Sequence, residues 1–144
     1  MKRLLIAVSL LAALLGVNAA ELKWSTDLPK ALEKAKAEKK LVLVNFTGSD
    51  WCGWCIKLDR EVFSKDEFAA YAEKSIVPVK IDFPRRVDQP AELKKANRSL
   101  QEKYEIRSFP TIVVLDAEGK ETGRLGYRPG GPKAFVEALE KLKK

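Results

Sequence analysis

The sequence predicts an α/β sandwich in which helices cover both faces of a central sheet. Short apolar runs rich in β-branched residues alternate with segments of helical periodicity. A hairpin pattern and an amphipathic helix then close the chain. Because residues 21–144 are enough for one domain with its own core, we predict a single α/β domain.

Two elements are predicted before the cysteines. Asp27 is a candidate N-cap, and the apolar residues after it recur at helical spacing to about residue 40. Residues 41–46 are apolar and mostly β-branched or long, which is typical of a strand buried on both faces. The polar residues 47–50 end that strand.

Two helices are predicted next. The first begins at the first cysteine, and its stripe consists of Cys52, Cys55, Ile56, Val62 and Phe63. Residues 64–67 have the pattern of a capping box, which predicts a second helix to about residue 74.

The second half of the chain completes the sheet. A strand is predicted at 76–83, where Pro78 weakens the prediction or lies near the strand start. The remaining predicted elements are a polar loop at 84–90, a helix at 91–104, a strand at 111–116, a turn at 117–120, a return strand at 121–125 and a terminal helix with apolar residues from 134 to 142.

The chain has two cysteines, Cys52 and Cys55, at the spacing of a redox-active dithiol. At a helix start, free N–H groups and the helix dipole favour a thiolate, so we predict that Cys52 is the nucleophile and that its pKa lies below about 8.5. Cys55 lies one turn later, where it can attack a mixed disulfide on Cys52 and act as the resolving thiol. The spacing leaves the direction of electron flow open.

Other uses of the two cysteines are less favoured. A structural disulfide is an alternative, but closing so short a loop stabilises by only about 2 kcal/mol. A zinc or iron–sulfur site usually needs four ligands, and the chain has no histidine. We therefore expect no metal centre. The absence of histidine also excludes Ser-His-Asp and Cys-His catalysis.

Residues 1–20 have the pattern of an export signal, with two cations followed by an apolar run at 4–17. Cleavage is expected after Ala19 or Ala20, which makes residues 21–144 the mature domain. As a helix, the apolar run would span about 21 Å, short of the roughly 30 Å of a hydrocarbon core. A permanent membrane anchor is therefore the weaker alternative.

The charge pattern gives little support to nucleic-acid binding. The formal net charge is +7, but lysines alternate with glutamates along helical faces, as in residues 33–40. That pattern is typical of a solvated surface, so we expect no nucleic-acid partner. A basic surface does favour acidic partners or anionic membrane surfaces.

The order of motifs resembles the thioredoxin superfamily over residues 24–143: a strand, WCGWC at 51–55 opening a helix, and SFPT at 108–111 entering a hairpin. Residues 48–55 are most similar to exported bacterial thioredoxin-like proteins, and more distantly to the C-terminal domain of the transmembrane reductant conduit DsbD. The resemblance implies a thioredoxin-like three-layer sandwich with a central mixed sheet, and thiol:disulfide exchange in the periplasm without a cofactor.

The resemblance also assigns residues that contact substrates. It implies that Pro110 is a cis-proline facing the dithiol, and that Phe109 and Pro110 line the substrate groove; a trans proline starting a strand is the alternative. At an exposed helix start, Gly53 and Trp54 are expected to form contact surface beside the cysteines; a core position is the alternative for Trp54. Trp51 either contacts the substrate or packs under the active-site loop.

The sequence departs from the thioredoxin pattern at Asn45. Thioredoxins have a buried aspartate at the corresponding position, which is thought to accept the proton of the resolving cysteine, and an amide cannot titrate. Asp59 follows Cys55 by four residues and shares its helix face. The DsbD domain has an acidic residue at the matching place. We predict that Asp59 accepts the proton of Cys55; a solvated or salt-bridged surface residue is the alternative.

Together these features predict a thiol:disulfide oxidoreductase that is a reductase or isomerase-like helper rather than a primary oxidant. It would act as a monomer on protein thiols and disulfides. The sequence has no nicotinamide or flavin fingerprint, so a reductase outside the cytosol needs a donor such as a membrane conduit of the DsbD type. A polypeptide-binding module with an incidental dithiol is the alternative from another class.

Overall fold

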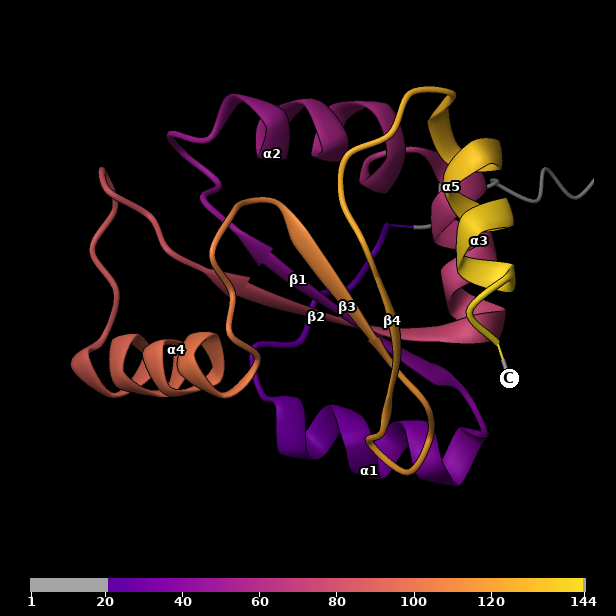
Figure 1. The fold of residues 1–144 in the computed structure, drawn as a ribbon, viewed down its shortest axis with the longest axis horizontal. Coiled ribbons are helices and arrows are strands. Elements are labelled where there is room, and N and C mark those ends of the chain that lie inside the picture. Colours follow the sequence, from indigo (N-terminus) through magenta and orange to yellow (C-terminus); the bar gives the residue numbers. More distant parts are fainter. Residues whose placement is uncertain (1–20, 144) are drawn as a thin grey trace, which may run out of the picture.

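The computed structural model describes residues 21–143, and the export signal predicted at 1–20 lies outside the described residues. A four-stranded sheet forms the centre, in the order β2-β1-β3-β4 (Figure 1). Its strands are β1 (Leu41–Thr47), β2 (Ile76–Asp82), β3 (Thr111–Leu115) and β4 (Glu121–Leu125). β1 pairs in parallel with β2 and antiparallel with β3, and β4 completes the hairpin. The predicted mixed sheet is confirmed.

Helices cover both faces of this sheet (Figure 1). They are α1 (Leu28–Glu38), α2 (Gly53–Leu58), the π-helical segment η1 (Asp59–Phe63) that continues it, α3 (Asp66–Ser75), α4 (Ala91–Lys103) and α5 (Gly131–Glu140). α1 and α4 pack on one face, and the other four pack on the opposite face. The three-layer sandwich is therefore confirmed. Within residues 21–143, no helix combines the length and apolar character that crossing a membrane requires.

β1 is buried on both faces, which explains its unbroken apolar run. Val42, Val44 and Phe46 belong to the core under α1, whereas Leu43 belongs to the core under α2, α3 and α5. Because side chains alternate along a strand, Asn45 lies on the same face as Leu43. The strand thus places a buried amide on the side of the sheet that carries the cysteine helix.

Local chemistry sets the bounds of α1. The Asp27 carboxylate accepts the N–H of Lys30 at 3.0 Å, an N-cap that contributes about 1 kcal/mol. Lys39 has a left-handed backbone and ends the helix just before β1. The predicted cap and helix are confirmed.

Pro78 lies inside β2, as its third residue, without interrupting the sheet. Its carbonyl accepts the N–H of Ser25 at 2.9 Å, and the N–H of Lys80 donates to Ser25 at 2.8 Å. These bonds are on the outer edge of β2, so the missing proline N–H would also have pointed away from β1. The ladder to β1 is therefore complete, as expected for proline on an edge strand.

Two details of the predicted helices are wrong. Ser64 does not open a capping box: it follows η1, and its hydroxyl donates to the Asp59 carboxylate at 3.0 Å instead of capping α3. Ile56 is 45% exposed and does not belong to the buried stripe, because it follows Cys55 directly and points about 100° away around the helix. Leu58 takes the inward position instead.

Candidate active site

The dithiol lies where α2 begins. Cys52 is the N-cap residue, and its Sγ accepts the backbone N–H of Cys55 at 3.3 Å. The two cysteines form a disulfide with Cα atoms 5.2 Å apart, and both are buried. In the reduced protein, the same N–H and the free N–H groups of the first turn favour a thiolate on Cys52.

The loop before β3 lies beside the dithiol. Its Phe109–Pro110 peptide bond is cis, as the resemblance implies. The Phe109 ring packs edge-on against Trp51, with centroids 5.9 Å apart. Since Trp51 directly precedes Cys52, this contact brings the proline loop next to the cysteines.

Trp51 packs under the active-site loop rather than projecting from it. Its indole N–H donates to the Phe83 carbonyl at 2.7 Å. A Cβ on Gly48 would lie 2.4 Å from the indole ring, so this position accommodates only glycine while Trp51 packs there. The guanidinium of Arg85 covers the ring, 3.7 Å from its centroid. Trp51 therefore supports the loop and carries a cation on its ring.

Trp54 and Gly53 form the exposed side of the helix start. Trp54 is 57% exposed, and no atom lies within 4 Å of a Cβ built on Gly53. The Trp54 ring stacks at a tilt on Tyr127, with centroids 5.0 Å apart, and the Lys57 ammonium lies near both rings. These contacts hold Trp54 in place while leaving much of its surface open.

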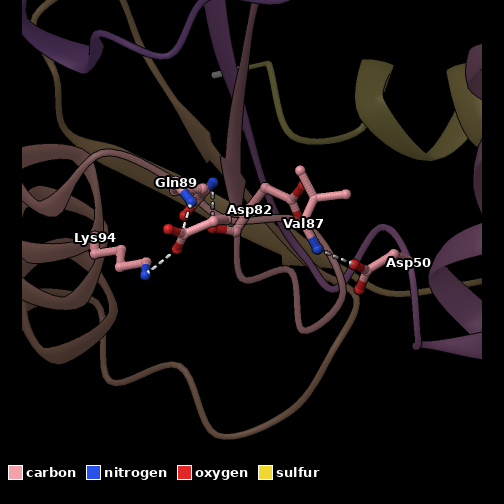
Figure 2. Close-up of polar contacts among 6 residues, drawn as sticks. Asp50, Asp82, Val87, Gln89 and Lys94 are labelled. Atoms are coloured by element: carbon pink, nitrogen blue, oxygen red, sulfur yellow. Dashed lines mark hydrogen bonds and ion pairs between the residues drawn. The ribbon is translucent and has the colours of Figure 1, made fainter.

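Asp50 joins the active-site loop to the loop at 84–90. Its carboxylate accepts three backbone N–H groups, from Arg85 at 2.9 Å, Arg86 at 2.7 Å and Val87 at 3.2 Å. Figure 2 shows the Val87 contact. The bond from Arg85 is the main cause of the lowered pKa of Asp50. No sequence pattern indicates this anchor, because the Asp50 carboxylate binds backbone groups 35 residues away, whatever their side chains are.

Removing the anchor should loosen this loop. In Asp50→Ala, we expect the amides of residues 85–87 to exchange with solvent about 10-fold faster, because three N–H groups lose a charged acceptor. Because the folded pKa is lowered, the anchor is complete above the ordinary carboxyl value of about 3.9 and is lost as pH falls through the folded value. Hydrogen exchange measures both effects. Asp88→Ala is the matched control, since the Asp88 carboxylate accepts the N–H of Gln89 and pairs with Lys94 at the other end of the loop. Unchanged exchange at 85–87 in Asp50→Ala would contradict the anchor.

A cavity of about 120 Å³ lies beside Cys55. Its lining residues are Asn45, Thr47, Ser49, Cys55, Ile56, Asp59 and Lys80. Asn45 and Lys80 are register partners on β1 and β2. The Asn45 side chain is buried, and its Oδ1 has no hydrogen-bond partner among residues 21–143. The buried strand position near Cys55 therefore holds an amide instead of a carboxylate.

Asp59 reaches the same cavity from the start of η1. It is exposed, and its carboxylate accepts the Ser64 hydroxyl. Its backbone N–H donates to the Cys55 carbonyl, which places it one turn after the cysteine. The structure thus brings Asp59 and Cys55 to one cavity, where water can connect the carboxylate to the sulfur.

A dithiol at a helix start, beside a cis-proline loop on a mixed α/β sheet, defines a thiol:disulfide oxidoreductase. The comparisons with known proteins agree. The chain belongs to the thioredoxin superfamily: the model of the family described as thioredoxin-like domain matches residues 28–143. The enzyme class predicted from the sequence is confirmed.

One relative and two solved structures show the likeness. The chain is 39% identical to the disulfide bond reductase DsbH of Chlamydia pneumoniae over 124 residues, which cover 86% of this chain and 74% of the relative. A solved structure of a DsbH oxidoreductase matches with a TM-score of 0.80 and 35% identity, covering 99% of this chain and 94% of that one. The C-terminal domain of Neisseria meningitidis DsbD shares the fold, with a TM-score of 0.61, 18% identity, and coverage of 84% and 100%.

Proposed function

We propose that this protein is a periplasmic reductase of protein disulfides. The observation that carries the proposal is the placement of Cys52 as N-cap of α2, with the Cys55 N–H directed at its sulfur. The 39% identity to a protein named disulfide bond reductase supports the direction. The exposed Trp54 beside the dithiol supports a polypeptide substrate.

The reaction has two exchange steps. The Cys52 thiolate attacks one sulfur of a substrate disulfide, which forms a mixed disulfide and releases the other substrate sulfur as a thiolate. Cys55 then loses its proton and attacks Cys52 Sγ, which releases the second substrate sulfur and forms the Cys52–Cys55 disulfide. Two electrons pass to the substrate, and both of its sulfurs take up protons. Asp59 accepts the Cys55 proton.

The groove for the substrate lies around this dithiol. Phe109 and Pro110 pair with an extended substrate segment through their backbone, and Gly53 and Trp54 contact its side chains. Trp51 supports this substrate site indirectly, because its ring packs under the active-site loop and against Phe109.

The cellular setting follows from the first residues and from the chemistry. Residues 1–20 direct export and are removed after Ala19 or Ala20, which leaves 21–144 as the working domain, a monomer. Each turnover leaves the dithiol oxidised, so a reductant is required. A membrane dithiol conduit of the DsbD type would supply the two electrons. Its dithiol would exchange with the Cys52–Cys55 disulfide, which returns both cysteines to thiols and leaves the conduit oxidised.

The reduction potential tests the direction. Equilibration with glutathione should give a value below about −195 mV, in the half of the range nearer to thioredoxin at about −270 mV than to the oxidant DsbA at about −120 mV. The reduced protein should also reduce the interchain disulfides of insulin. A value near that of DsbA would overturn the reductase role, and failure to reduce insulin would favour a binding module with an incidental dithiol.

A further inference from the structure

Four exposed arginines lie on segments that contact the active-site loop or α2. Arg85 and Arg86 lie on the loop at 84–90, Arg107 lies two residues before Phe109, and Arg128 follows Tyr127. Among the residues that the structure describes, none of these four arginines forms an ion pair. Their charges are therefore available to a partner.

The carboxylates nearby already have internal partners. Asp50 binds three backbone N–H groups, and Asp88 pairs with Lys94. Glu61 accepts the Tyr127 hydroxyl at 2.8 Å, and Asp59 accepts the Ser64 hydroxyl at 3.0 Å. Bonds to neutral groups leave the charge of a carboxylate in place, but none of these carboxylates lies within ion-pair distance of the Arg85 or Arg86 guanidinium group. Both guanidinium groups can therefore bind carboxylates of an acidic segment.

Arg85 is ordered before any partner binds. Its guanidinium stacks on Trp51 at 3.7 Å from the ring centroid, and its backbone is held by Asp50. A stacked guanidinium keeps its N–H edges free for a carboxylate. Because the side chain and the loop are already held, binding costs less conformational entropy. The backbone of Arg86 is held by the same carboxylate.

Apolar side chains are exposed on α2 and on the loop that Asp50 holds. Trp54 is 57% exposed on α2, and Val87 is 66% exposed on the loop that carries the arginines. A substrate segment that crosses the dithiol therefore meets apolar contacts and arginines together.

We propose that Arg85 and Arg86 select protein substrates whose reactive cysteine is flanked by acidic residues. This inference rests on the proposed disulfide exchange and names the substrate class for the same site. The occupant is an extended polypeptide segment with Asp or Glu near its cysteine, bound through its carboxylates to the two guanidinium groups. Attraction of this kind acts mainly on the association rate and weakens with salt.

Two disulfide-linked fluorogenic peptides test the selection. The two peptides have the same sequence except beside the cysteine. The acidic peptide has Asp and Glu there, and the basic peptide has Lys and Arg. At low salt, the reduced wild type should react about 10-fold faster with the acidic peptide, and salt should narrow the difference. Arg85→Gln/Arg86→Gln should remove most of the preference. Lys34→Gln/Lys141→Gln removes two positive charges from exposed positions on other elements, and this control should keep the preference for the acidic peptide.

Equal rates for the two peptides in the wild type, or equal losses in the two double variants, would overturn the selection. Arg86→Gln alone leaves the stack of Arg85 on Trp51 intact and should lower the preference for the acidic peptide by about threefold. This single variant tests the selection even if the double variant does not fold. A neutral small disulfide, hydroxyethyl disulfide, separates the two proposals. If it is reduced without any charge preference among peptides, only the selection fails, and if it is not reduced, the proposed function fails as well.

Discussion

Cys52→Ser should lower the rate of disulfide reduction by at least about 1,000-fold, because it removes the group that attacks the substrate. The structure supports this assignment. Cys52 is the N-cap of α2, next to the exposed Gly53 and Trp54, whereas Cys55 lies inside the helix and lines the cavity beside Asn45. The oxygen of serine is not ionised at neutral pH, so it does not replace the thiolate as a nucleophile.

Cys55→Ser is the matched variant, since it removes the second sulfur and keeps the first. It should react with a substrate disulfide and then stop, so that a mixed disulfide on Cys52 accumulates. Mass spectrometry of the non-reduced mixture identifies the linked residue. If the mixed disulfide forms in Cys52→Ser and not in Cys55→Ser, the assigned roles of the two cysteines are reversed.

Asp59→Asn should slow the release of a Cys52 mixed disulfide by about 10- to 100-fold near neutral pH, because general-base help to Cys55 is lost. The initial attack by Cys52 should change little. The carboxylate and Cys55 line one cavity of about 120 Å³, which has room for water to carry the proton between them. Stopped-flow fluorescence measures attack and release as separate phases.

Two controls separate proton transfer from structure. Ser64→Ala removes the hydroxyl bonded to Asp59 and keeps the carboxylate, so release should stay fast. Asp66→Asn changes a carboxylate that does not line the cavity beside Cys55, and it should also leave release unchanged.

A third variant tests the buried position. Asn45→Asp in the Asp59→Asn background should restore part of the rate, because a carboxylate would again lie beside Cys55, with Lys80 as its register partner. If release in Asp59→Asn equals that of the wild type, Asp59 is a surface charge. Water or the leaving thiolate then takes the proton.

Much of the fold depends on local patterns, which is why it could be predicted. The cap at Asp27, the apolar run of β1 and the turn between β3 and β4 each express preferences of neighbouring residues. Periodicity also placed the dithiol at the start of a helix. The mixed sheet and the cis bond before Pro110 came from the resemblance, since no local pattern distinguishes them.

Local patterns failed where two structures competed for the same residues. Residues 64–67 match a capping box, but the π-helical turn before them places the Ser64 hydroxyl on Asp59. Ile56 looks like part of a core stripe because it is apolar and adjacent to Cys55, yet its direction from the helix exposes it. A hydrophobic residue at a helix start can be buried or can join a binding surface, and composition does not decide between them.

The sequence by itself determined the enzyme class, because two cysteines at a helix start need only neighbours in the chain to form a reactive pair. The tertiary structure decided what surrounds that pair. Parallel pairing of β1 with β2 brings the loop at 84–90 to Asp50 and Trp51, and places Lys80 beside Asn45. Such contacts join residues 35 positions apart, and only the paired strands bring them within bonding distance.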